Sequence, residues 1–204
     1  DESSSDKRDA RDAVTICNLV REGKCLDSRM PEGIYRQLRT LGKVRERLMR
    51  YHAGTKHALK AVLDNYFPEL KEVFWSMSAK GLREVVKERP FPEDALKMRV
   101  EEVARIIATK SRRNKTAREK AERICEAARE SIGLKEIGIA DRYRVKMYPE
   151  ELKRATANVK EIEKQMGKLL KQLPEARILM SINGIGELSA AVFLGELRNP
   201  DNFR

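Results

Sequence analysis

Apolar residues recur along residues 152–173 at alternating steps of three and four, and this repeat constrains the fold more than any other feature of the chain. The repeating positions are Leu152, Ala155, Val159, Ile162, Met166, Leu169 and Leu173. Such steps place the side chains on one side of an α-helix, where a partner must cover them. Three and a half heptads fit a coiled coil and a helix of an ordinary bundle equally well, so both remain open.

The residues before this repeat indicate where its helix begins. Pro149 suits a first helical turn, because proline lacks the backbone N–H that would go unpaired there. Glu150 and Glu151 suit the positive end of the helix dipole. We therefore expect the helix to start at Pro149.

The composition favours helices along the rest of the chain. Its 204 residues are 37% charged and 5% aromatic, with 11 glycines and 7 prolines. A β-sandwich or barrel needs more aromatic and turn-forming residues. We expect an all-α fold of long antiparallel or coiled-coil helices. No segment approaches 18 apolar residues, so we expect no membrane contact.

Periodicity and helix breakers divide the chain into further elements. We expect a helix from about residue 6 to Gly23, a loop over 27–33, and a long helix from Ile34 to about Tyr66. After the latter, Phe67, Phe74 and Trp75 are expected to form a satellite core. A helical stripe follows over 96–132, and residues 174–204 predict a helix, a tight glycine turn and a helix.

The charge of the chain predicts an anionic partner. The net charge is +11 and the isoelectric point about 9.7. A basic chain of this size most often binds nucleic acid, although a basic surface also serves solubility alone. Cys17, Cys25 and Cys125 are odd in number and widely spaced. They indicate neither a disulfide framework nor a zinc site, which fits a reducing, cytoplasmic setting.

Two basic segments are candidates for phosphate contacts. Between Ile34 and Lys60 there is only one acid, Glu46, whereas a solvated helix normally interleaves acids with its cations. The cations of this segment are Arg36, Arg39, Lys43, Arg45, Arg47, Arg50, Lys56 and Lys60. The second segment contributes Arg112, Arg113 and Lys115. We expect at least one of these patches to contact nucleic acid.

A glycine turn near the carboxyl end is a third candidate. Gly184 and Gly186 lie in Ile182-Asn183-Gly184-Ile185-Gly186, which resembles a helix-hairpin-helix. There, glycines let backbone N–H groups approach a phosphate beside a helix N-terminus. The alternative is a plain helical hairpin with a glycine cap. His52 and His57 lack a third ligand, so we assign them no metal.

Three carboxylates near the amino end could hold a metal. Asp6, Asp9 and Asp12 recur at steps of three, which places them on one face of a helix. Carboxylates so placed repel unless a cation neutralises them, and Mg²⁺ prefers such oxygen ligands. Paired metals of this type drive phosphoryl transfer. The alternative is an acidic first turn that complements the helix dipole.

Four motifs in order resemble the DEDD insertion-sequence transposases, the family of the Piv DNA invertase and the bridge-RNA-guided recombinases. Lys7-Arg8-Asp9-Ala10-Arg11-Asp12-Ala13 looks like the Lys-x-Asp-x-x-Asp-Ala motif of the family. Leu38-Arg39 with Arg45-Glu46-Arg47-Leu48, and Phe67-Pro68-Glu69-Leu70, look like its next signatures. Residues 179–203, from Gly184-Ile185-Gly186 to Phe193-Leu194-Gly195-Glu196-Leu197 and Phe203, look like the opening of its serine-bearing domain. The resemblance covers nearly the whole chain.

The resemblance implies a site-specific recombinase that cleaves and rejoins DNA with Mg²⁺. Asp9 and Asp12 match the last two of four metal-binding acids, and Lys7 joins the candidate nucleic-acid contacts. The implied domains are the last helix of an RNase H-like domain (1–24), a coiled-coil linker (25–172) and the start of the transposase domain (173–204). The other acids and the serine would lie outside the chain, so we expect an inactive fragment.

The resemblance also implies partners: DNA, a structured guide RNA in some members, and a second copy of the chain through the helical region. We favour self-association through the 152–173 repeat over its pairing with residues 34–62 of the same chain. The alternative function is a non-catalytic helical protein that binds DNA or RNA and is complete as it stands. The flanking sequence would separate the two, because only the enzyme needs an upstream Asp and Glu.

Overall fold

The computed structural model describes residues 3–23, 31–108 and 114–197, and within these the side chains of residues 3–10, 114 and 115 are left out. The described residues form helices and connecting turns without a strand, which confirms the all-α prediction. The helices are α1 (Ser3–Arg21), α2 (Gly33–Tyr66), α3 (Leu70–Val73), α4 (Lys80–Glu88), α5 (Pro92–Leu96), α6 (Val100–Ala108), α7 (Asn114–Arg129), α8 (Ile139–Leu170), α9 (Glu175–Met180) and α10 (Glu187–Leu197).

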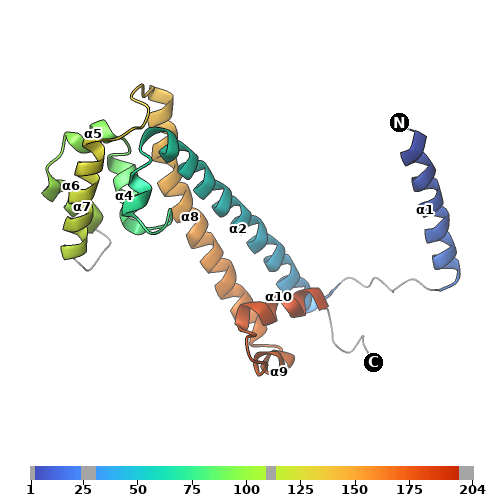
Figure 1. Ribbon diagram of the computed structural model, residues 1–204. Coiled ribbons are helices and arrows are strands. Elements are labelled where there is room, and N and C mark those ends of the chain that lie inside the picture. Colours follow the sequence, from blue (N-terminus) through green and yellow to red (C-terminus); the bar gives the residue numbers. More distant parts are fainter. Residues whose placement is uncertain (1–2, 24–30, 109–113, 198–204) are drawn as a thin grey trace.

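A hairpin of two long helices organises the molecule (Figure 1). Helices α2 and α8 have 34 and 32 residues, which is about 50 Å each at 1.5 Å per residue. They run antiparallel: Arg45 contacts Glu163, and His52, further along α2, contacts Thr156, further back along α8. Among the described helices, none combines the length and the apolar character that crossing a bilayer requires.

The seam of α8 is covered within the same chain. Leu152, Ala155, Val159 and Met166 are buried, and α2 is the helix that α8 contacts most extensively. The intramolecular pairing that the sequence left open is therefore the one observed. Because α2 occupies the seam, the seam no longer argues for self-association, which stays a prediction without support from these residues.

Helix α8 begins ten residues before Pro149, so the predicted start was wrong. Gly138 precedes the first turn, and its N–H donates to the Asp141 carboxylate at 3.3 Å. Further along, Val145 is fully buried and Arg142 donates two hydrogen bonds to Asp94, at 3.0 and 3.1 Å. Pro149 removes one backbone hydrogen bond from the helix interior. The buried contacts of the added turns offset that loss.

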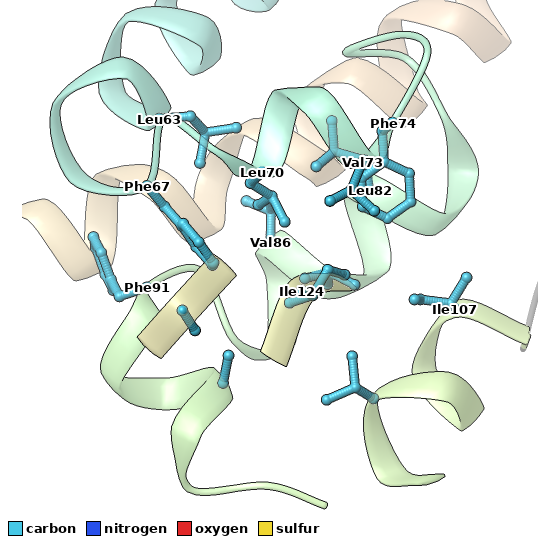
Figure 2. Close-up of a cluster of buried hydrophobic side chains, with 14 of the residues drawn as sticks. Leu63, Phe67, Leu70, Val73, Phe74, Leu82, Val86, Phe91, Ile107 and Ile124 are labelled. Carbon is cyan, nitrogen blue, oxygen red and sulfur yellow. The ribbon is translucent and has the colours of Figure 1, made fainter. Parts of the chain in front are cut away.

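One hydrophobic core lies where α2 ends, between its last turns and helices α3–α8 (Figure 2). Phe67 and Phe74 are buried in it as predicted, but Trp75 is fully exposed, so its assignment to the core was wrong. The backbone at Phe74 is extended, with φ −119° and ψ 126°. Successive side chains of extended backbone point to opposite sides, so Phe74 points inward and Trp75 outward.

A second core lies at the other end of the hairpin, where α9 and α10 pack on α2 and α8 (Figure 1). Its buried residues are Leu38, Met166, Leu170, Leu173, Ala176, Ala190, Ala191 and Leu194. The predicted helix, glycine turn and helix are observed here as α9, residues 181–186 and α10. The two cores share no buried residue.

Helix α1 stands away from the hairpin (Figure 1). Every described side chain from residue 11 to residue 23 is exposed, including the apolar Val14, Ile16 and Val20. The predicted helix near residues 6–23 is thus present, and it ends at Arg21 just before Gly23, which has a φ of +65°. Division of the chain into three domains stays a prediction.

Candidate nucleic-acid interface

Four cations of α2 form a stripe along its outer face: Arg36, Lys43, Arg47 and Arg50, here called the α2 stripe. Their steps of seven, four and three residues keep them within one narrow sector of an α-helix. All four side chains are exposed, and the residues that α2 buries, such as Leu38 and Leu59, lie on another side. The stripe is about 21 Å long at 1.5 Å per residue.

Neighbouring acids neutralise little of this charge. Among the described residues, the α2 stripe has one salt bridge, in which Arg50 contacts the exposed Glu46 at 3.5 Å. Lys43 and Arg47 are like charges four residues apart, an arrangement that destabilises a helix slightly. A polyanion would relieve that repulsion, whereas water only screens it.

The four other predicted cations of α2 lie off the α2 stripe and either pair with acids or are half-buried. Arg39 contacts Glu196 of α10 at 3.3 Å, and Arg45 contacts Glu163 of α8 at 2.9 Å; both are half-buried. Lys56 is also half-buried, and Lys60 donates to Asp64 at 2.7 Å. Arg39 and Arg45 therefore attach α2 to neighbouring helices, and a phosphate would compete with their carboxylate partners.

The glycine turn lies at the end of the hairpin where α2 begins. Gly184 has a φ of +91°, which favours glycine, and α10 starts at Glu187. Gly184 and Gly186 are exposed, and a Cβ at either would meet nothing within 4 Å. The turn is thus open enough to approach a phosphate, while its acceptance of one stays a prediction.

The predicted metal-binding acids lie on α1. Asp9 and Asp12 both fall in this helix, one turn apart, and Asp12 is exposed. The side chains of Lys7, Asp9 and Lys115 and the whole of Arg112 and Arg113 lie outside the described residues. Within the part that is described, no three His, Cys, Asp or Glu residues gather in a cluster that could hold a metal.

His52 and His57 are not brought together. His57 is exposed, while His52 is half-buried with its Nε2 3.4 Å from the Thr156 hydroxyl. Burial, followed by the charges of Lys56 and Arg83, holds the pKa of His52 below its usual value of 6.5. A neutral His52 therefore belongs to the packing between α2 and α8.

Sequence reasoning missed a second row of cations, on α8 and at Lys171 directly after its last residue. Lys146, Lys153, Lys160, Lys164 and Lys171, here called the α8 stripe, are all exposed. Their steps of seven, seven, four and seven residues place them on one side of the helix. The signal was in the sequence, but Glu150, Glu151, Glu161 and Glu163 lie between these lysines and mask the row.

Comparison with known proteins identifies the first third of the chain. Residues 1–68, which hold α1 and α2, match the DEDD transposase family of IS110 elements, described as a transposase. No curated protein and no solved structure matches the chain. The matched segment includes Asp9, Asp12 and the whole α2 stripe. Residues 1–68 of the chain are therefore similar to the DEDD transposases of the IS110 family.

Proposed function

We propose that the chain serves an insertion-sequence transposase that cleaves and rejoins DNA with Mg²⁺, and that the α2 stripe holds the DNA backbone. One observation supports the DNA-binding role of the α2 stripe. The stripe lies inside the segment that matches the transposase family, and its four exposed cations have a single acid partner among the described residues. Cations without acid partners are available for phosphate contacts.

Contacts of this kind position DNA without reading its sequence. Arginine and lysine bind phosphate oxygens that every base pair presents, so sequence preference should be weak. Each contact releases condensed counterions and adds about 0.9 to the dependence of log affinity on log salt concentration. Four contacts would account for a slope of about −3.6.

Asp9 and Asp12 would supply two of the ligands for Mg²⁺. Carboxylate oxygens are the ligands this ion prefers, and α1 places the two residues one turn apart. When bound, the ion would supply positive charge to the scissile phosphate. Asp12 is exposed, like every other described side chain of α1, so it can reach an ion held between the protein and DNA.

Guide RNA and a second protomer are finer parts of the same proposal. The backbone of a structured RNA carries the same phosphate chemistry, so the α2 stripe would hold it in the same way. Because α2 covers the α8 seam, a second protomer would have to dock on another surface of the helical region.

Salt-dependent binding tests the role of the α2 stripe. A DNA duplex of about 20 base pairs, roughly two helical turns, is titrated with the chain at several salt concentrations. Replacing the stripe by glutamine (Arg36→Gln, Lys43→Gln, Arg47→Gln, Arg50→Gln) should flatten the slope by up to about 3.6. An unchanged slope would place the DNA elsewhere.

A control variant removes the same charge from other surfaces. Lys97, Arg99, Arg129 and Lys135 are exposed and lie off both stripes. Changing all four to glutamine should leave most of the slope in place. Equal losses in the two variants would show that only net charge matters, and would reject the stripe as a defined contact.

Cleavage tests the metal ligands separately. In the transposase that contains these residues, Asp9→Asn and Asp12→Asn should each abolish Mg²⁺-dependent strand cleavage while DNA binding persists. Cleavage that survives both substitutions would remove these residues from the metal site. The non-catalytic alternative predicts binding without cleavage whatever stands at these positions.

A further inference from the structure

The α8 stripe carries more unbalanced charge than a solvated helix face requires. Among the described residues, only Lys153 of the five lysines has a salt bridge, to Glu150 at 3.8 Å. Lys160, Lys164 and the neighbouring Lys168 are successive like charges four residues apart. Each such pair destabilises a free helix slightly, so the row is costly unless an anion lies along it.

The acids near the stripe neutralise it only in part. Glu163 contacts Arg45 of α2 at 2.9 Å, and Glu161 accepts a hydrogen bond from Gln165. Glu150 accepts a hydrogen bond from Lys87 of α4 at 2.9 Å, with Lys153 further away. Glu163 and Glu150 are therefore paired mainly with cations of other helices once the chain folds.

The α8 stripe and the α2 stripe face away from each other. The seam residues Leu152, Val159 and Met166 face α2 and are buried. At about 100° per residue, the stripe lysines lie about 125° from that seam. At the same rotation per residue, the α2 stripe lies about 145° from the buried residues of α2. The stripes therefore lie along opposite outer edges of the hairpin.

This geometry prevents one straight duplex from touching both stripes. Packed helix axes are about 8–10 Å apart, and each helix with its side chains is about 10–12 Å across. The two edges are therefore about 20 Å apart and point in opposite directions. A duplex that lies along one edge leaves the cations of the other in water.

We propose that the α8 stripe is a second backbone-binding surface, and that the hairpin holds one DNA duplex along each outer edge. From Lys146 to Lys171 the α8 stripe covers 26 residues, about 38 Å or roughly one turn of duplex. The inference rests on the proposed function for its first surface, because bridging requires that the α2 stripe also binds. The α8 surface itself stands on its own residues.

Bridging is tested with the whole chain and two labelled duplexes. One duplex of about 20 base pairs carries a donor dye and the other an acceptor. Energy transfer at low salt, with two duplexes per chain by light scattering, is the expected result. The molar mass without DNA is measured at the same concentration, and two duplexes per monomer are required, because a dimer could also bridge.

Variants separate the two surfaces. Lys153→Gln, Lys160→Gln and Lys164→Gln together should lower the stoichiometry from two duplexes to one and abolish energy transfer. Arg36→Gln, Lys43→Gln and Arg47→Gln together should also leave one duplex, held by α8. A matched control with Lys97→Gln, Arg99→Gln and Lys135→Gln should keep two.

The possible failures are distinguishable. One duplex per chain in the unchanged protein, or two in the α8 variant, would overturn the second surface. If the α2 variant still binds two duplexes, the proposed role of the α2 stripe fails instead. Loss of all binding in the α8 variant would show a single site on α8 and would overturn the bridging arrangement.

Discussion

Substituting Gly133 with alanine should disrupt the contact between the loop before α8 and the end of α2. A Cβ at this position would lie 2.2 Å from the carbonyl oxygen of Tyr66 and 2.5 Å from its carbon, whereas ordinary contact begins at 3.4 Å. The obstructing atoms are backbone, so no flexible side chain can move aside. The loop must therefore shift by about 1 Å.

That shift lowers the free energy of unfolding. It would break the hydrogen bond from the Leu134 N–H to the Asn65 carbonyl, now 2.8 Å long, at about 0.5–1.5 kcal/mol. Overpacking adds about 1–3 kcal/mol. Alanine also lowers the conformational entropy of the unfolded chain, which offsets about 0.4–1 kcal/mol of this destabilisation. The expected net loss of unfolding free energy is about 2 kcal/mol, or about 1 M in the urea midpoint.

Far-ultraviolet circular dichroism during urea unfolding is the measurement, because fully exposed Trp75 makes fluorescence a poor reporter. Gly54→Ala is the matched control. Gly54 lies inside α2, and a Cβ there would meet nothing within 4 Å, so alanine should stabilise by up to about 1 kcal/mol. If Gly133→Ala also leaves the midpoint unchanged or raises it, the close contact at Tyr66 is refuted.

Three smaller predictions follow from contacts along the hairpin and inside the first core. A double-mutant cycle on Arg45 and Glu163, measured by urea unfolding, should give a coupling of about 0.5–1 kcal/mol, and a zero coupling would mean that this half-buried pair holds nothing. Because the fold lowers the pKa of His52, the unfolded chain takes up a proton before the folded chain as the pH falls through 6.5. The free energy of unfolding should therefore decline there in the unchanged chain but not in His52→Gln, and parallel pH profiles of the two proteins would contradict this. A maleimide should label exposed Cys17 quickly but should label buried Cys125, whose thiol pKa is raised by burial, only after denaturant is added. Peptide mass spectrometry measures the labelling of each cysteine, and equal labelling of the two in the folded chain would contradict the prediction.

Much of the fold could be predicted from the sequence, because heptad spacing indicates directly which face of a helix is buried. It located the seam of α8 and offered residues 34–62 as one possible cover, which is the cover observed. The sequence could not show whether residues 34–62 or a second chain cover this seam, because an apolar stripe that packs within a chain looks the same as one that packs between chains. Pro149 misled for a similar reason: proline suits a first turn and also survives inside a helix that tertiary contacts hold.

The candidate site was less predictable, because it depends on which acids the fold pairs with which cations. Arg39 and Arg45 look like Arg36 and Arg47 in the sequence, yet only the fold turns the first two toward Glu196 and Glu163. The α8 lysines were missed for the opposite reason, because acids such as Glu163 lie between them in the sequence but contact other helices in the fold. A charge count along a helix averages over faces that the folded chain separates.

The separation of the two cores has a consequence for how the molecule opens. Between Leu38 and Thr55, α2 has no buried residue, and the opposing part of α8 buries only the small Ala155 and Val159. The middle of the hairpin therefore holds less buried apolar surface than either end, and half-buried contacts such as the Arg45–Glu163 pair contribute there. Regions with few buried apolar contacts exchange their amide hydrogens through local opening, well below the cost of global unfolding. The two ends of the hairpin should therefore behave as separate cooperative units, with slow exchange at each end and faster exchange at a thinner waist. Strain applied by a ligand at one end would then be absorbed at that waist before it reached the other.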